Sequence, residues 1–167
     1  MNPDQKKTVL RMIPYGIYVL TADDGKGNIS AATVNWVTQT AFAPPLLVVG
    51  VKTDSGTYQT VKAAHSFALN MLGKDQKSLA FTFFRPADVS DGKLSGQSFR
   101  KGTTGAPILI DVVGAVECRV ISIVEQGDHH IVVGEVIDAH LNKPLAGRPD
   151  SAILEMKDLG ETVFYGG

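Results

Sequence analysis

Hydrophobic and polar residues alternate along two long stretches in the second half of the chain. Val112–Val124 and Ile131–Leu141 show this alternation, and Gln126-Gly127-Asp128 separates them. A period of two is that of a β-strand with one apolar face, and a glycine-containing connection between two such strands predicts an antiparallel hairpin. The only cysteine, Cys118, occupies an apolar position of the first stretch, so we expect a buried, unreactive thiol.

Shorter patterns predict the other elements. Asn2 is a favourable cap and Pro3 a favourable first residue for a short opening helix. The same signals predict four further strands, over Ile17–Thr21, Ile29–Phe42, Leu46–Val51 and Phe67–Leu72. They also predict two further helices, over Tyr58–Ala64 and Gln76–Phe84. Because strands and helices do not alternate regularly, the pattern argues against a parallel, doubly wound sheet. It predicts a mostly β domain with six or seven strands in a barrel-like arrangement and two or three short helices.

Two segments differ from this alternating pattern. Leu46–Val51 is continuously apolar, which suits a strand buried on both faces. Arg85–Ala106 combines glycines, mixed charge and little periodicity. It predicts a long loop or flap, and ordered loops of this length more often carry function than structure.

Composition and charge narrow the possible classes of protein. The 167 residues are 44% hydrophobic and 20% charged, as in folded globular proteins, and we expect a single domain over residues 1–167. A net charge of −1 gives no general attraction to nucleic acid or to a membrane surface, so we expect neither partner. Residues 1–7 lack the apolar core of a secretory signal, and no run approaches the roughly 20 apolar residues of a membrane span. We therefore expect a cytoplasmic protein.

A cluster of hydroxyl groups precedes the helix predicted to begin near Tyr58. Lys52, Asp54, Ser55, Gly56 and Thr57 lie at its N-terminal end. Free backbone amides and the helix dipole make such a position attractive to a phosphate, and a glycine allows close approach. An ordinary helix cap is the simpler interpretation of the same residues, and the local sequence leaves both open.

Uncharged hydrogen-bonding residues recur along the long strand predicted over Ile29–Phe42. A solvent-facing strand usually carries charged side chains, whereas these positions hold Thr and Asn: Thr33, Asn35, Thr38 and their neighbours Trp36 and Val37. Such groups suit the edge of a flat heteroaromatic ligand, which needs both donors and acceptors. A buried strand with internally satisfied hydroxyls explains them equally well.

The four histidines do not form a metal-binding pattern. His129 and His130 are adjacent, so on a strand they point to opposite faces and cannot ligate one metal together. We expect no metal site, and we expect His65 and His140 at the surface. His129 lies in a turn, where an exposed and a functional histidine are equally compatible with the sequence.

Five motifs, in order along the chain, give a more specific indication: Gly16–Ala22, Asn35–Gln39, Phe42–Leu46, Gly127–His129 and Gly134–Val136. Together they resemble the flavin reductase-like family of FMN-binding split barrels, over about residues 8–141. Thr104–Ile108 resembles a stretch of flavoredoxin-like proteins and of the reductase domain of high-molecular-weight rubredoxin.

The resemblance implies a Greek-key antiparallel split barrel that forms a homodimer, with FMN near the interface. It implies that Thr33–Thr38 lines the isoalloxazine ring, mainly through backbone groups, and that Lys52–Thr57 holds the phosphate. His129 is the residue implied to position the nicotinamide, and the Arg85–Lys101 flap is implied to cover the flavin. Ala41 departs from the family pattern, which often has a serine there, so that one flavin contact is absent.

The function implied is that of an NAD(P)H-dependent flavin reductase. NADH or NADPH gives a hydride from C4 of its nicotinamide to N5 of FMN, and electrons pass on to an oxygenase, a rubredoxin-like protein or another acceptor. The alternative is an FMN electron carrier reduced by a partner protein, and a third possibility is a related split barrel that binds haem or pyridoxal phosphate. For the aromatic residues of Leu159–Gly167 we favour packing on the barrel over lining the flavin pocket or fraying.

Overall fold

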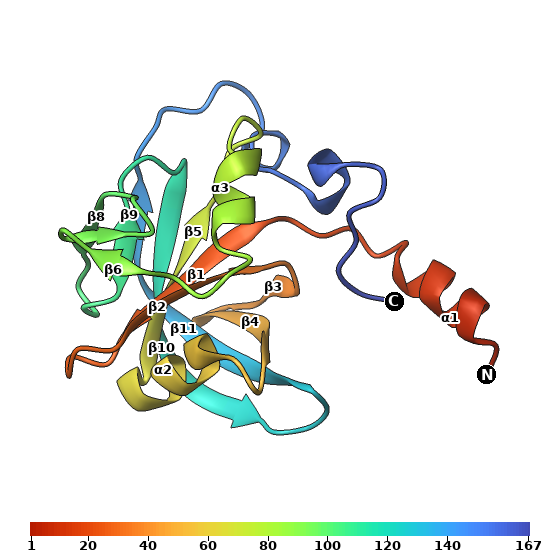
Figure 1. Cartoon of the computed structure of the whole chain (residues 1–167), viewed down its shortest axis with the longest axis horizontal. Coiled ribbons are helices and arrows are strands. Elements are labelled where there is room, and N and C mark those ends of the chain that lie inside the picture. The colour runs from red at the N-terminus through yellow and green to blue at the C-terminus, as the bar shows by residue number, and fades with distance from the viewer.

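The computed structural model describes residues 1–167, and its main feature is one seven-stranded antiparallel sheet (Figure 1). The strands run in the order β2-β1-β5-β10-β11-β4-β3. Their bounds are β1 Tyr18–Asp23, β2 Ile29–Val34, β3 Val37–Phe42, β4 Pro45–Lys52, β5 Ser66–Met71, β10 Gly114–Val124 and β11 His129–Leu141. The sheet is strongly curved but not closed. The prediction of a mostly β, antiparallel fold with six or seven strands is therefore confirmed.

Three α-helices and several short elements complete the fold. The helices are α1 Pro3–Leu10, α2 Gly56–Ala64 and α3 Lys77–Thr82. Two 3-10 helices, η1 Pro149–Ser151 and η2 Met156–Leu159, follow the sheet, and the short strands are β6 Val89–Ser90, β7 Lys93–Leu94, β8 Phe99–Lys101 and β9 Pro107–Leu109. The number of α-helices agrees with the prediction, and no helix is long and apolar enough to cross a membrane.

The hairpin predicted over residues 112–141 is present as β10 and β11. The two strands pair antiparallel from Gly114 with Leu141 to Val124 with Ile131, with register shifts after Glu117 and Val120. Cys118 is fully buried, and burial together with the neighbouring carboxylate of Glu117 raises the pKa of its thiol to about 12. The prediction of a buried, unreactive thiol agrees with this environment.

The central strands β1 and β5 are buried on both faces. Leu20 and Ala22 pack into a core of 11 residues on the concave side of the sheet, whereas Val19 packs into a second core of 12 residues on the other side. Because side chains alternate across a strand, two cores explain why five of the six residues of β1 are buried. Residues of α3, the flap and the segment after β11 cover the second face.

Two strand predictions were wrong in detail. Ile29–Phe42 is not one strand: it breaks at Asn35 and Trp36, so that β2 and β3 lie at opposite edges of the sheet. β4 is not buried on both faces, because its residues alternate between buried and partly exposed. One face of β4 packs into the concave core, and its other face borders the candidate site described below.

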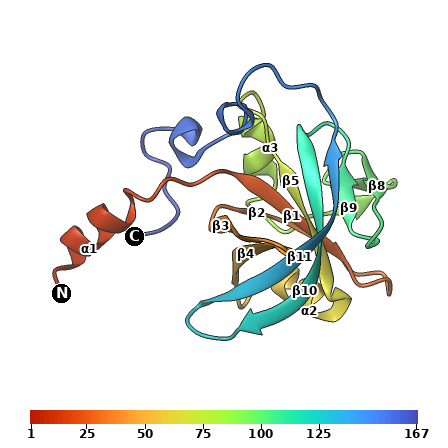
Figure 2. The ribbon, with the colours of Figure 1, turned by 180° about the vertical axis from the view of Figure 1, so that it is seen from behind.

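Helix α1 begins as predicted and then projects away from the sheet (Figures 1 and 2). The Asn2 side chain accepts hydrogen bonds from the amides of Asp4 and Gln5, both at 3.0 Å. None of its residues is buried, and Val9 and Leu10 remain 60% and 40% exposed. The apolar face of this helix is therefore not covered by its own chain.

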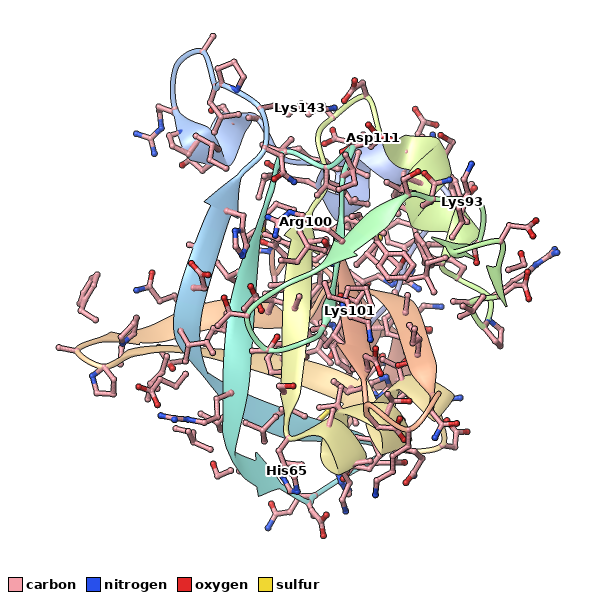
Figure 3. The ribbon with its side chains drawn as sticks, turned by 90° about the vertical axis from the view of Figure 1, so that its left-hand side faces the viewer. His65, Lys93, Arg100, Lys101, Asp111 and Lys143 are labelled. Atoms are coloured by element: carbon pink, nitrogen blue, oxygen red, sulfur yellow. The ribbon has the colours of Figure 1, made fainter.

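The flap over residues 85–106 packs on the sheet rather than standing free. Leu94 is fully buried, and Lys101 forms a 2.7 Å ion pair with Asp23, whose side chain is only 4% exposed. Figure 3 shows Lys93, Arg100 and Lys101 along this segment, with His65 at the far end of the sheet. The ion pair fixes the flap to the end of β1.

Candidate functional site

A cavity of about 420 Å³ opens between β2, the end of β4, the start of β11 and residues 163–165. We call it the inner cavity. Its volume is in the range of pockets that hold one small organic ligand. Ten of its sixteen lining residues are hydrophobic, as is usual for a site that encloses a planar ring and orients it with a few polar groups.

The break between β2 and β3 places a polar and an aromatic residue beside this cavity. Asn35 is 4% exposed, lines the cavity, and donates from Nδ2 to the carbonyl of Tyr165 at 3.0 Å. Trp36 packs its indole on Gly50, where a Cβ atom would lie only 3.2 Å from the ring. Nε1 of Trp36 is buried and has no hydrogen-bond partner. Thr33 also lines the cavity, and its hydroxyl donates to the carbonyl of Ala80 at 2.7 Å.

His129 stands at the first position of β11, paired in register with Lys52 of β4. Its Nδ1 lies 3.1 Å from Oδ1 of Asp128, and its Nε2 lies 2.7 Å from the hydroxyl of Tyr165. A neutral imidazole with its proton on Nδ1 satisfies both contacts, because Nδ1 then donates and Nε2 accepts. The hydrogen bond from His129 lowers the pKa of Asp128. His130 points to the opposite face and contacts the hydroxyl of Tyr58, as the sequence predicts.

The loop before α2 borders the same cavity. The Ser55 side chain accepts from the amide of Tyr58 at 3.1 Å and donates to the carbonyl of Lys52 at 2.7 Å, so it caps the helix. The amides of Gly56 and Thr57 open the helix and have no carbonyl four residues earlier within it. A hydrogen bond to Asp54 raises the pKa of Lys52. Lys52 and Ser55 therefore line the inner cavity, and the first two amides of the helix border the space that adjoins it.

A larger groove of about 920 Å³ adjoins the inner cavity along β2 and α2. We call it the β2–α2 groove. The two share Ala32, Ser55, Phe83 and Phe84. Ser30 lines the groove, and its hydroxyl is buried without a partner. An orphaned hydroxyl and free helix amides are groups that a polar ligand can satisfy, so the residues present fit a phosphorylated ring compound.

The predicted site residues separate into three groups. Thr33, Asn35, Lys52, Ser55 and His129 line the inner cavity, and Asp54, Gly56 and Thr57 line the β2–α2 groove together with Ser55. Trp36, Val37 and Thr38 face a third space of about 1230 Å³ beside α1, which we call the α1 groove. Lys52 and His129 border both the inner cavity and the α1 groove. The structure thus brings the two predicted segments together with His129 between them.

Two predicted or noted features lie outside the cavity. Ala41, the departure from the family pattern, lines neither the inner cavity nor the β2–α2 groove. Of the flap, only Arg85, Pro86 and Ala87 line the β2–α2 groove. The other residues of the segment predicted to cover the flavin line neither the groove nor the inner cavity.

The structure adds residues 163–165 to the site. Val163, Phe164 and Tyr165 line the inner cavity, whereas the sequence favours packing of the aromatic residues on the barrel. Ring centroids of Trp36 and His129 lie 4.6 Å apart, and Tyr165 lies 5.5 Å from Trp36 and 5.7 Å from His129. The aromatic residues near Phe164 were the only signal in the sequence, and they do not reveal which surface the segment covers.

The side chain of His140 is only 17% exposed, whereas the sequence predicts it at the surface. Its Nε2 lies 2.7 Å from Oε1 of Glu117, which is fully buried. The Glu117 carboxylate also accepts from the amides of Thr103 and Thr104 and from the Thr104 hydroxyl, at 2.6–3.0 Å. Glu117, His140 and Asp138 approach one another closely enough to hold a metal ion. The oxygens of Glu117 are already used by these donors, so the cluster anchors the loop before β9.

Comparison with known protein families decides what kind of protein carries this cavity. Residues 10–156 match the family described as flavin reductase like domain. The chain belongs to the flavin reductase-like family. The resemblance inferred from five short motifs is thereby confirmed.

Individual relatives agree with the family assignment. A flavin reductase of Pseudomonas putida is 30% identical over 92% of this chain and 86% of its own length. Two proteins of Rhizobium meliloti are 36% and 31% identical over 72% and 81% of this chain: one named "Probable flavin reductase" and a stachydrine N-demethylase reductase subunit. The matches span only 38% and 57% of the lengths of those two proteins.

Solved structures of the family share the fold. The styrene monooxygenase flavin reductase of Pseudomonas putida superposes with a TM-score of 0.69 at 24% identity, over 86% of this chain and 89% of its own. An NADH:FAD oxidoreductase of Streptomyces globisporus, in complex with NAD and FAD fragments, gives a TM-score of 0.68 at 28% identity, over 83% and 88% of the two chains.

Proposed function

We propose that this protein is an NAD(P)H-dependent flavin reductase that binds FMN and passes its electrons to an acceptor. The observation that carries the proposal is one cavity that joins His129 to the phosphate-compatible start of α2. A bound flavin and a reduced nicotinamide would supply the chemistry, a hydride transfer from C4 of the nicotinamide to N5 of the flavin. The protein contributes orientation and electrostatics, since the cofactors carry the chemistry.

Each predicted residue has a separate task in this proposal. The amides of Gly56 and Thr57, with Lys52, hold the phosphate of FMN. Thr33, Asn35 and the backbone through Thr38 border the ring edge, where fixed donors stabilise negative charge on the reduced flavin. His129 orients the nicotinamide. Asp128 in turn orients His129, through a contact of 3.1 Å to Nδ1.

The phosphate site is tested by comparing FMN with riboflavin, which lacks the phosphate. Lys52→Met should weaken FMN binding about tenfold, equivalent to one hydrogen bond of about 1.4 kcal/mol, and leave riboflavin binding unchanged. Lys62→Met is a matched control, because Lys62 is a similarly exposed lysine that pairs with Glu125 on the far side of α2. Equal loss for both ligands would contradict a phosphate role for Lys52.

Reductase activity is tested by anaerobic titration of the flavin-loaded protein. Bleaching of the visible flavin absorption by NADH or NADPH supports the reductase, and a comparison of the two donors assigns the coenzyme. If neither NADH nor NADPH reduces the flavin but a redox protein does, the result supports the electron carrier instead. The Tyr165 hydroxyl on His129 favours this second function for the conformation described, because it covers the group proposed to meet the nicotinamide.

FAD is the second ligand to test. The β2–α2 groove extends the inner cavity beyond the proposed phosphate site, and Phe84 on its wall is 51% exposed. An adenosine attached to the flavin phosphate has room there. If FAD binds more tightly than FMN, the groove is the site of its adenosine half; equal affinity restricts recognition to the FMN part.

We propose a homodimer with the flavin near its interface. Support comes from large apolar residues that the single chain leaves exposed around the α1 groove and the β3–β4 turn, including Leu10 at 40%, Ile131 at 43% and Phe42 at 91%. Most soluble oligomers are two-fold symmetric. Light scattering should give twice the mass of the chain, and a flavin-saturated monomer would contradict the interface site.

We also propose a redox partner that takes the electrons, either an oxygenase or a rubredoxin-like protein. The name of one relative, a reductase subunit of a demethylase, supports this expectation. Reduced protein mixed with each class of acceptor under anaerobic conditions identifies the partner by the rate at which the flavin is reoxidised.

A further inference from the structure

Residues 162–167 lie across the side of the inner cavity where His129 stands; we call them the closing segment. Figures 1 and 2 both show this end of the chain between α1 and the β3–β4 edge of the sheet. The hydroxyl of Tyr165 lies 2.7 Å from Nε2 of His129, and its carbonyl accepts from Asn35. The backbone of Gly166 lies on the indole of Trp36, where a Cβ atom would be 3.4 Å from Nε1. Three proposed site residues thus contact one segment.

The closing segment is held by few contacts. Arg11 donates from Nε to the carbonyl of Gly166 at 3.2 Å, and its guanidinium lies 4.2 Å from the centre of the Phe164 ring. With the two bonds of Tyr165 and a bond of 3.1 Å from the amide of Val163 to the carbonyl of Gly160, four hydrogen bonds join residues 162–167 to the rest of the protein. Phe164 and Tyr165 are 50% and 47% exposed. Segments with little buried apolar surface open at low free-energy cost.

The bond to His129 occupies the acceptor that a substrate would need. With Nδ1 turned to Asp128, Nε2 is the only remaining nitrogen of the imidazole, and the Tyr165 hydroxyl donates to it. Burial, reinforced by Asp128 and Asp54 against Lys52, raises the pKa of Tyr165, so this hydroxyl stays protonated at neutral pH. The amide group of a nicotinamide is likewise a donor. The two donors compete for one lone pair.

The space available leads to the same conclusion. With the closing segment in place, the inner cavity measures about 420 Å³, near the lower end of volumes that hold a single small ligand. It has room for one flavin ring system. A nicotinamide stacked on that ring needs the volume that Phe164 and Tyr165 now fill.

We propose that Tyr165 occupies the position on His129 at which the nicotinamide binds. The closing segment must then move away from the inner cavity before the dinucleotide can bind. The proposal rests on the reductase function proposed above. The apparent affinity for the dinucleotide is then reduced by the fraction of molecules in which the segment is open. The proposed phosphate contacts of the flavin at the start of α2 form no hydrogen bond with the closing segment, so they are kept when the segment opens.

The first test is steady-state kinetics of Tyr165→Phe, which removes only the hydroxyl. The KM for the nicotinamide donor should fall about two- to tenfold, the equivalent of one hydrogen bond, with kcat and the Kd for FMN unchanged. Arg11→Met and removal of residues 162–167 should lower the same KM without altering His129. Tyr15→Phe is the matched control, because its exposed hydroxyl donates to Leu10 and does not contact the histidine. A rise in KM or a fall in kcat for Tyr165→Phe would overturn the proposal, since Tyr165 would then assist the reaction.

A second test does not depend on turnover. Trp36 is the only tryptophan, so acrylamide quenching of its emission reports whether Gly166 covers the indole. In flavin-loaded protein, saturating NAD⁺ should raise the quenching of the full chain to the level of the variant without residues 162–167. If NADH reduces the bound flavin but Trp36 stays shielded from acrylamide in the presence of NAD⁺, the proposed displacement of the closing segment is wrong and the reductase function stands. If NADH reduces no variant, the reductase function fails, and this inference fails with it.

Discussion

The backbone carbonyl of Asp128 accepts two hydrogen bonds from Thr53, one from its amide at 3.0 Å and one from its hydroxyl at 3.2 Å. Thr53 precedes the helix whose first amides face the proposed phosphate site, and Asp128 precedes His129. The two ends of the proposed flavin and nicotinamide site are therefore joined directly. A displacement of one loop is transmitted to the other.

Thr53→Val tests this connection, because it removes the hydroxyl and keeps the amide. The variant should lose about 0.5–1 kcal/mol of unfolding free energy, and both FMN and NADH should bind more weakly. Urea denaturation and ligand titration measure the two effects. Thr82→Val is a suitable control, since the Thr82 hydroxyl bonds only within α3. Weaker binding of only one ligand would show that the loops act independently.

His129→Ala should slow flavin reduction by about tenfold, equivalent to one lost positioning hydrogen bond of about 1.4 kcal/mol. FMN affinity should remain nearly unchanged, since the proposed phosphate contacts are intact. Single-turnover stopped-flow at saturating NADH measures the rate. His130→Ala provides the comparison, because the adjacent side chain points to Tyr58 on the other face. An unaltered rate in His129→Ala would remove His129 from the mechanism.

Glu117→Gln should destabilise the protein by about 1–3 kcal/mol, because buried amide and hydroxyl donors lose part of their acceptor. Urea denaturation measures the loss. Glu125→Gln should change stability by less than about 0.5 kcal/mol, since that carboxylate is exposed. Equal losses of unfolding free energy in the two variants would mean that burial of Glu117 adds nothing to the stability of the protein.

The same carboxylate predicts a pH dependence. Burial opposes ionisation of Glu117, but hydrogen bonds from Thr104, His140 and Thr103 outweigh it and lower its pKa below the ordinary 4.5. A lowered folded-state pKa gives stability that is complete above pH 4.5 and is lost as the pH falls through the lowered value. Glu117→Gln should lack this part of the acid dependence, measured as the unfolding free energy from pH 7 down to pH 3. A parallel acid curve for both proteins would contradict the assignment.

Cys118 should resist thiol reagents at neutral pH while the protein is folded. Its pKa of about 12 and its full burial leave almost no thiolate and no access. In urea the same thiol should react completely, so the labelling rate follows global unfolding. Rapid labelling without denaturant would show that β10 opens locally.

Local sequence patterns were sufficient to predict the elements whose stability is local. The β10–β11 hairpin follows from alternation and the turn at Gly127, and the start of α1 follows from Asn2 and Pro3. The break at Asn35 and Trp36 was missed because neither residue is a strong strand breaker. It is imposed from a distance, by Gly50, which leaves space for the indole, and by the cavity on which Asn35 lies.

The candidate site was predicted in parts. Capping chemistry pointed to Ser55 and Gly56, and the family resemblance pointed to His129, but neither indicates that Thr53 joins them. The pairing of Glu117 with His140 and the contact of Tyr165 with His129 could not be predicted. Both depend on side chains brought together from separate segments, Tyr165 from 36 residues away along the chain.

Gly50 lines the inner cavity but offers no side chain to a ligand, and the indole of Trp36 packs against it. A methyl group at this position would lie 3.2 Å from the indole and 3.3 Å from the Cβ of Trp36, tighter than most side-chain contacts. It would displace a ring whose centre lies 4.6 Å from that of His129 and 5.5 Å from that of Tyr165. Substitutions at position 50 should therefore reshape the pocket in small steps without changing any of its functional groups. A family that serves many different acceptors could diversify through such a position, and a library at residue 50 offers a direct route to altered substrate preference.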